Sequence, residues 1–230
     1  MRAQGATDTL GMRFAWLGFL LFLPSPVLAE TPLYWAIANN DALEVWHLTA
    51  ETTPDSLEEN GLTLPAWAVE RGSGEVIDVL TWRGVALDRV DDQGRNLLFG
   101  AAAQGRLDLF EKIEAAGARV DQVDRQGRTL VHAAAPSPHP EMLKTLLARG
   151  LGAVSRSSLG VTPLMLACLG GRADEAAILL AWGSVPEDQD YLGRSVRDYA
   201  VAGDDPATLA EVEAALTPWT ISQDGGDPLP

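Results

Sequence analysis

The sequence predicts an all-α solenoid of about six helix–turn–helix units joined by β-hairpin-like loops. Three observations lead to this fold class. Glycine recurs every 33 residues, alanine recurs seven positions after each of these glycines, and a hydroxyl or amide side chain recurs two positions after each. Agreement of several columns at one period indicates a repeat array, in which units bury their apolar faces by stacking on neighbours. The leading glycines are Gly61, Gly94, Gly127, Gly160 and Gly193.

Each unit is expected to contain two helices. The side chain two positions after the leading glycine is a good N-cap, because its oxygen can accept a hydrogen bond from a free amide of the first helix. A glycine eleven positions along, such as Gly105, ends that helix in a left-handed turn. The second helix places apolar residues three apart on one face and ends at another glycine, such as Gly117. The N-caps are Thr63, Asn96, Thr129, Thr162 and Ser195.

The array is expected to extend from residue 30 to residue 217. Two departures from the period stand out. The stretch PSPHPE (136–141) replaces the glycine between the helices of one unit, so this turn is expected to be stiffer than the others. Residues 218–230 are rich in Gly, Pro and Asp and are expected to be a disordered C-terminal tail. The units are expected near residues 30–58, 59–91, 92–124, 125–157, 158–190 and 191–217.

These residues resemble the ankyrin repeat, which has the same period and a Thr-Pro-Leu-His-x-Ala signature. TPLMLA (162–167) matches it well, and TLVHAA (129–134) and TPLYWA (31–36) match it closely. TLPAWA (63–68) and NLLFGA (96–101) are degenerate, and SVRDYA (195–200) is poor, as is common in terminal repeats. The resemblance covers nearly all of the chain after residue 29. It implies a binding scaffold without indicating its partner, because the family binds many unrelated proteins.

Residues 1–29 are predicted to be a secretory signal peptide. An arginine, Arg13, precedes the apolar run 14–23, and Val27 and Ala29 supply small or allowed residues for cleavage after Ala29. The run is short for a bilayer span, although retention as an anchor stays open. The sequence also leaves open whether Met1 or Met12 is the true start. We expect export to the bacterial periplasm.

Composition excludes several classes of function. The formal net charge of −15 disfavours nucleic acid and anionic membranes as partners, and favours a basic protein. The chain has one cysteine, Cys168, which is expected to be a buried, inert thiol. We find no catalytic or cofactor motif and expect neither an enzyme nor a cofactor. The acidic loop residues, among them Asp91, Asp124 and Asp190, are expected to form a solvated rim.

His132 occupies the histidine position of the signature, where the resemblance implies a structural imidazole that bonds the backbone of a neighbouring repeat. The alternative from another class is a metal-binding or enzymatic protein that uses His132 and His139, with Cys168. The prolines between the two histidines keep them off one helix face, which weakens that alternative.

The resemblance places the partner-binding surface at the loop tips and the inner face of the first helices. On this chain the N-terminal half of that surface is polar and the C-terminal half is apolar. We expect the apolar half to anchor a protein partner and the polar half to set its register. The alternative is that the apolar half packs against the C-terminal tail. The candidate partner-binding residues are Arg95, Gln104, Arg125, Arg128, Leu159, Val161, Leu169, Tyr191 and Leu192.

The leading hypothesis is a monomeric, non-enzymatic periplasmic module that holds or inhibits a protein partner. An immunity protein against an exported toxin, an envelope stress-protection factor and an envelope scaffold all fit this class. A third class, a structural array that self-associates, predicts a concentration-dependent oligomer.

Overall fold

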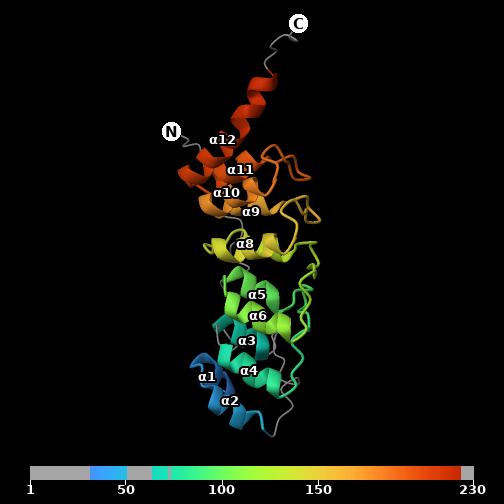
Figure 1. Cartoon of the computed structure of the whole chain (residues 1–230), viewed down its shortest axis with the longest axis vertical. Helices are drawn as coiled ribbons and strands as arrows, with labels where there is room; N and C mark the ends of the chain where they lie inside the picture. Colours follow the sequence, from blue (N-terminus) through green and yellow to red (C-terminus); the bar gives the residue numbers. More distant parts are fainter. Residues whose placement is uncertain (1–31, 51–63, 72–73, 224–230) are drawn as a thin grey trace, which may run out of the picture.

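The computed structural model describes residues 32–50, 64–71 and 74–223. Within these ranges the regular structure is helical, apart from one isolated antiparallel bridge between Gln189 and Ser195. Helices follow one another in pairs, and the pairs stack into an elongated array (Figure 1). The helices are α1 (Pro32–Ala38), α2 (Ala42–Leu48), α3 (Leu64–Arg71), α4 (Gly74–Trp82), α5 (Leu97–Ala103), α6 (Leu107–Ala115), α7 (Leu130–Ala134), α8 (Pro140–Ala148), α9 (Pro163–Leu169), α10 (Ala173–Ala181), α11 (Val196–Ala202) and α12 (Pro206–Gln223).

The predicted N-caps begin the first helices of their units. Asn96 accepts a hydrogen bond from an amide of the first turn of α5 at 3.2 Å. Thr162 does the same for α9 at 3.4 Å, and Ser195 for α11 at 3.2 Å. Each bond satisfies one of the amides that a helix leaves free at its start. The N-cap prediction is confirmed at these positions, whereas Thr63 lies outside the described residues.

The turn between the two helices of a unit requires a left-handed residue. Gly105 and Gly171 adopt φ of 66° and 62° there. Asn40 and Asp204 occupy the equivalent position in other units, each with φ of 54°. Asparagine and aspartate tolerate this region better than most residues with a side chain. Among the described turns the exception is Pro138, which cannot adopt positive φ, so its unit turns differently.

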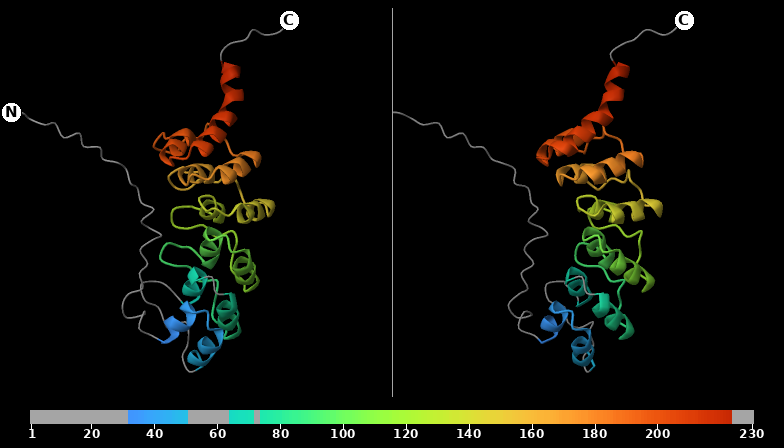
Figure 2. Two further views of the ribbon diagram at one scale, coloured as in Figure 1. Left: turned by 90° about the vertical axis from the view of Figure 1, so that its left-hand side faces the viewer. Right: turned by 60° about the vertical axis from the view of Figure 1, so that its left-hand side comes forward.

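An apolar core runs the length of the array. First helices pack on first helices of neighbouring units, as α5 does on α7, and second helices on second helices, as α4 does on α6 (Figure 2). The recurrent alanine of the first helices is fully buried, which lets these helices approach closely. The second helices contribute the larger side chains. Those that are fully buried include Ile77, Leu80, Phe110, Ile113, Leu143 and Leu146.

The loops between units are tight hairpins that lie on one side of the array (Figure 1). In the first described loop, the Asp91 amide donates to the Arg95 carbonyl at 2.8 Å and the Gly94 amide donates to the Asp91 carbonyl at 2.8 Å. Gly94 has φ of 78° and is the left-handed residue that follows the turn and closes the hairpin. The same two bonds recur in the loops around Gly127, Gly160 and Gly193. These bonds explain the hairpin-like form expected from the sequence.

The C-terminal boundary differs from the expected one. Helix α12 continues to Gln223, so residues 218–223 are helical and do not belong to a disordered tail. The break in the repeat period at Pro218 suggested an end, but the next helix-breaking residues are Gly225 and Gly226. Residues 224–230 and the predicted signal peptide lie outside the described residues. Among the described helices, none has the length and apolar character needed to cross a membrane.

Candidate partner-binding surface

Each loop tip is held by a side chain at its base. The Asp124 carboxylate accepts hydrogen bonds from the Gln126 and Arg128 amides at 2.9 and 2.8 Å. Its other oxygen accepts from the Arg128 guanidinium at 2.7 Å. The Asp124 side chain is 1% exposed, so the pair is largely desolvated on one side. Asp91 with Arg95 and Asp190 with Arg194 repeat this arrangement.

The expectation of a solvated acidic rim is therefore wrong for Asp124 and Asp190. Asp124 and Asp190 are buried because their acceptors satisfy loop amides that have no other partner. Burial opposes ionisation of Asp190, but hydrogen bonds from the loop amides, Arg194 and Tyr199 outweigh it and lower its pKa. Burial and the bond to Asp190 raise the pKa of Tyr199 to about 12.

One loop uses a neutral version of the same device. Ser157 stands in the place of the aspartate, and its hydroxyl accepts from the Leu159 and Val161 amides at 3.3 and 3.1 Å. Val161 stands in the place of the arginine. In this loop the buried anchor is uncharged, and the position that holds arginine in the other described loops holds an apolar residue. The arginines of the other loops are therefore part of the loop structure as well as of its surface.

Successive loops are joined by a ladder of backbone hydrogen bonds. The Arg125 amide donates to the Gln93 carbonyl at 2.7 Å, and the Ser158 amide donates to the Gln126 carbonyl at 2.7 Å. The Tyr191 amide continues the series by donating to the Leu159 carbonyl at 2.9 Å. Because each described loop, from the one around Gly94 onward, is tied to its neighbour, these tips form one continuous, preorganised surface.

The C-terminal loops carry large apolar side chains at their tips. Leu159, Tyr191 and Leu192 are 55%, 69% and 72% exposed, and together they are named the apolar tip patch. The Tyr191 ring lies close against the backbone of Gly160, where an added Cβ would meet it at 2.7 Å. This contact orients the ring while leaving most of it exposed.

The other predicted binding residues have mixed positions. Arg125 is exposed at a loop tip, whereas Gln104 is partly buried at the C-cap of α5. Arg95 and Arg128 retain 30% and 39% exposure of their side chains although both are paired. Val161 and Leu169 are partly buried and pack against the core. The polar half of the predicted surface thus also serves the loops, a role that sequence reasoning missed.

His132 links two units. The amide of Thr129 donates to its Nδ1 at 3.1 Å, so that nitrogen is an acceptor and the ring proton lies on Nε2. Nε2 then donates to the Val161 carbonyl of the next unit at 3.1 Å. Burial lowers the pKa of His132, which favours this neutral form. Both ring nitrogens are thus used inside the fold, in the structural role that the resemblance implied.

The residues considered for metal binding or catalysis are dispersed. His139 is exposed at the start of α8 and packs over Gly105. Cys168 is buried, and burial raises the pKa of its thiol to about 12, which disfavours the reactive thiolate. Within the described residues, no group of three or more His, Cys, Asp and Glu side chains is placed to hold a metal ion.

Comparison with known proteins agrees with the repeat pattern. A family model of ankyrin repeats, with three copies, matches residues 98–190. This range includes helices α6 to α10 and the two loops that carry Asp124 and Leu159. It ends at Asp190, at the base of the last loop. No curated protein matches the chain.

Proposed function

Because the chain belongs to the ankyrin-repeat family, whose repeats mediate protein–protein interactions, we propose that it is an exported, non-enzymatic module that binds and holds or inhibits a protein partner. The apolar tip patch is the observation that carries this proposal. Three large apolar side chains, each more than half exposed, are an unusual feature of loop tips on a soluble protein unless they contact something.

The rigidity of the tips supports binding. Ordering of flexible loops consumes binding free energy, and here the loop ladder and the buried anchors have already ordered them. Tyrosine is also among the residues that most often dominate the energetics of protein interfaces. A partner would therefore gain most of its affinity at the apolar tip patch, with Tyr191 as its main anchor.

The polar half would set the register of the partner. Arg125 is exposed at its tip, and the paired arginines Arg95 and Arg128 keep part of their side chains accessible. Exposed charges contribute little to affinity but steer association and disfavour wrong alignments. The net charge of −15 favours a partner with a basic surface elsewhere.

Affinity capture tests the surface. The purified chain would be immobilised and incubated with periplasmic extract of the source bacterium, and bound proteins would be identified by mass spectrometry. We expect the double variant Leu159→Asp, Tyr191→Asp to lose the partner that the wild type captures, because charge at the patch prevents its desolvation. Helicity measured by circular dichroism should stay unchanged, since both side chains are exposed.

A matched control is available on the outer helices. Leu43 in α2 is 69% exposed, so Leu43→Asp introduces the same kind of change far from the loop tips. It should leave capture intact. If the double variant captures the partner as well as the wild type does, or if Leu43→Asp abolishes capture equally, the patch is not the binding surface.

Export and assembly are tested separately. Cell fractionation with N-terminal sequencing should find a periplasmic chain that begins at Glu30, as the predicted cleavage after Ala29 requires. Analytical ultracentrifugation should find a monomer across concentrations. A concentration-dependent oligomer would instead support a self-associating array. The identity of the captured partner distinguishes an immunity protein from a stress-protection factor or scaffold.

A further inference from the structure

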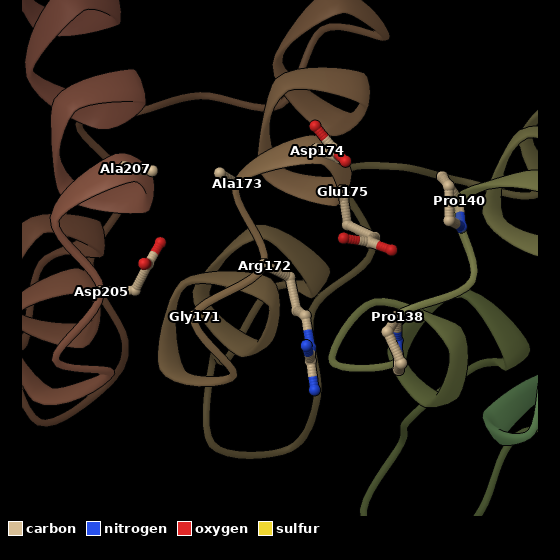
Figure 3. Close-up of a pocket in the computed structure, with 9 residues that line it drawn as sticks. All are labelled: Pro138, Pro140, Gly171, Arg172, Ala173, Asp174, Glu175, Asp205 and Ala207. Carbon is tan, nitrogen blue, oxygen red and sulfur yellow. The ribbon is translucent and has the colours of Figure 1, made fainter.

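A hollow of about 330 Å³ lies at the turns between paired helices, the opposite ends of the helices from the loop tips (Figure 3). It is bounded by three successive units. The proline-containing turn before α8, the turn between α9 and α10, and the start of α12 form its walls. Its volume is at the lower end of the range for ligand pockets, about 300–1,000 Å³. The lining residues include Pro138, Pro140, Arg172, Asp174, Glu175 and Asp205.

Glu175 breaks a column of the repeat. The equivalent positions of the three preceding units are Val76, Leu109 and Met142, and all three side chains are fully buried. Glu175 is just as deeply placed, with 3% exposure. A repeat array is stable with an apolar residue here, so the fold does not require an acid at this position. An acid that replaces a core residue indicates a role other than packing.

One oxygen of the Glu175 carboxyl group is not satisfied by the described part of the protein. Its Oε1 is buried and has no hydrogen-bond partner among the described residues. In Figure 3 the Glu175 carboxyl group lies on the same side of the hollow as Pro138 and Pro140, whereas the Asp174 side chain points away from Arg172. Burial raises the pKa of Glu175. A buried acceptor without a donor is costly to stability, and a donor that enters the hollow removes this cost.

The other charged residues of the lining are Asp174, Asp205 and Arg172. Asp205 accepts hydrogen bonds from the amide and hydroxyl of Thr208 at 2.8 and 2.6 Å, and these bonds lower its pKa. Arg172 is the one cationic side chain of the lining, and its Nε donates to the Pro136 carbonyl at 3.1 Å. Apart from Asp174, which points away, the lining holds two carboxyl groups, those of Glu175 and Asp205, and one guanidinium, so its charge favours a cation over an anion.

The walls of the hollow are stiff. Pro138 and Pro140 restrict the turn before α8. Gly170 and Gly171 allow the turn before α10 to lie close to its neighbours. A Cβ added to Gly170 would lie 3.1 Å from the Pro136 carbonyl oxygen, and a Cβ added to Gly171 would lie 3.0 Å from the Asp205 side chain. The cavity is therefore formed before any ligand arrives, and the departure PSPHPE in the sequence builds one of its sides.

We propose that this hollow is a binding site for a basic side chain, lysine or arginine, of a protein ligand. The aliphatic stem lies along Pro138 and Pro140, and the charged head donates a hydrogen bond to Oε1 of Glu175. The site is separate from the apolar tip patch, and the inference does not depend on the proposed function of that patch.

Titration with small probes tests the site. Backbone amide signals of the purified chain would be followed by NMR as N-acetyl-lysine methylamide or N-acetyl-arginine methylamide is added, with the norleucine analogue as the uncharged probe. We expect saturable shifts at Gly171, Arg172 and Ala173 with at least one basic probe and none with norleucine. Glu175→Met, which restores the residue type of the column, should weaken the binding of that probe about tenfold or more.

Two further variants make the outcome decisive. Glu111→Gln removes an exposed acid from α6 and should leave the affinity unchanged. The tip-patch variant Leu159→Asp, Tyr191→Asp should also bind the probe as the wild type does, which separates this site from the proposed function. Equal shifts with norleucine, no saturable shift with either basic probe, or an unchanged affinity in a folded Glu175→Met variant would overturn the proposal.

Discussion

At the scale of single residues, the loops depend on buried carboxylates. Asp124 satisfies two loop amides and forms an ion pair with Arg128. A buried carboxylate that loses its cation is left with an uncompensated charge, which costs more than the pair itself contributes. The chain contains its own neutral alternative in Ser157 and Val161. Comparison of the two versions separates the structural role of Arg128 from any role in binding.

Arg128→Val is expected to lower the free energy of unfolding by about 1–2 kcal/mol, because Asp124 stays buried without its cation. The loss is not larger because the Arg128 side chain is partly exposed, so solvent already screens the pair. The double variant Asp124→Ser, Arg128→Val, which copies the loop at Ser157, should recover most of this loss. Urea unfolding followed by circular dichroism measures both. A double-mutant cycle with no coupling energy would show that the pair is not the reason for the arginine.

His132 gives the array a pH dependence. Burial holds the pKa of the folded imidazole below its ordinary value of about 6.5. The unfolded chain therefore takes up a proton first as the pH falls, so this contribution to stability is complete above about pH 6.5 and is lost below it. His132→Asn should remove it.

We expect the stability difference between wild type and His132→Asn to shrink as the pH falls from 7 to 5, by at most about 1.4 kcal/mol per pH unit. Chemical denaturation of both proteins at several pH values measures it, and the use of a difference cancels the pH dependence that the two proteins share. A difference that is constant with pH would mean that folding does not lower the pKa of His132.

At the scale of elements, the hairpins act as a connected row. Each takes its shape from a left-handed glycine and its position from the next hairpin, through bonds such as that from Tyr191 to Leu159. Two glycines allow these contributions to be separated. Gly160 and Gly193 have nearly the same φ, 76° and 77°, but a Cβ on Gly160 would meet Tyr191 whereas one on Gly193 would meet nothing within 4 Å.

Gly193→Ala should therefore cost about 1–2 kcal/mol for the left-handed backbone alone. Gly160→Ala carries the same cost and must also displace the Tyr191 ring and backbone, so its loss of stability should be larger. It should also weaken capture of the partner at the apolar tip patch, whereas Gly193→Ala should not. Equal destabilisation by the two substitutions would show that Tyr191 does not pack on Gly160 in solution.

Sequence reasoning reached the elements more easily than the site. The left-handed glycines, the N-caps and the structural role of His132 follow from local chemistry that repeats at a fixed period, so each unit supports the assignment of the others. The burial of Asp124 did not follow, because an acidic loop residue resembles a solvated one until its amide partners are located. Glu175 left a signal in the sequence as an acid in an apolar column, but its unpaired oxygen required the packing of three units.

At the scale of the whole molecule, the array is elongated and strongly acidic. Its two candidate sites lie at opposite ends of the helices, the apolar tip patch on the loops and the hollow at the inter-helix turns. The chain has 32 acidic and 17 basic residues, so like charges are spread along the array. Stacked units cannot move apart to relieve this repulsion without exposing their shared core, so the repulsion acts on the folded state.

Salt is therefore expected to stabilise the protein. At 0.01 M ionic strength the screening length of about 30 Å covers several units, whereas at 0.1 M it falls to about 10 Å. Salt also weakens the attractive pairs between units, such as Lys112–Asp78 and Arg149–Glu114, but these pairs are partly exposed and contribute about 0–1 kcal/mol each. The relief of repulsion should be the larger effect, because the net charge is −15.

The thermal midpoint should therefore rise between 10 and 200 mM NaCl, and equally in KCl. It should rise less in a folded variant in which the exposed acids Glu111 and Glu211 are changed to Gln. A midpoint that falls with salt would mean that the pairs between units outweigh the net charge.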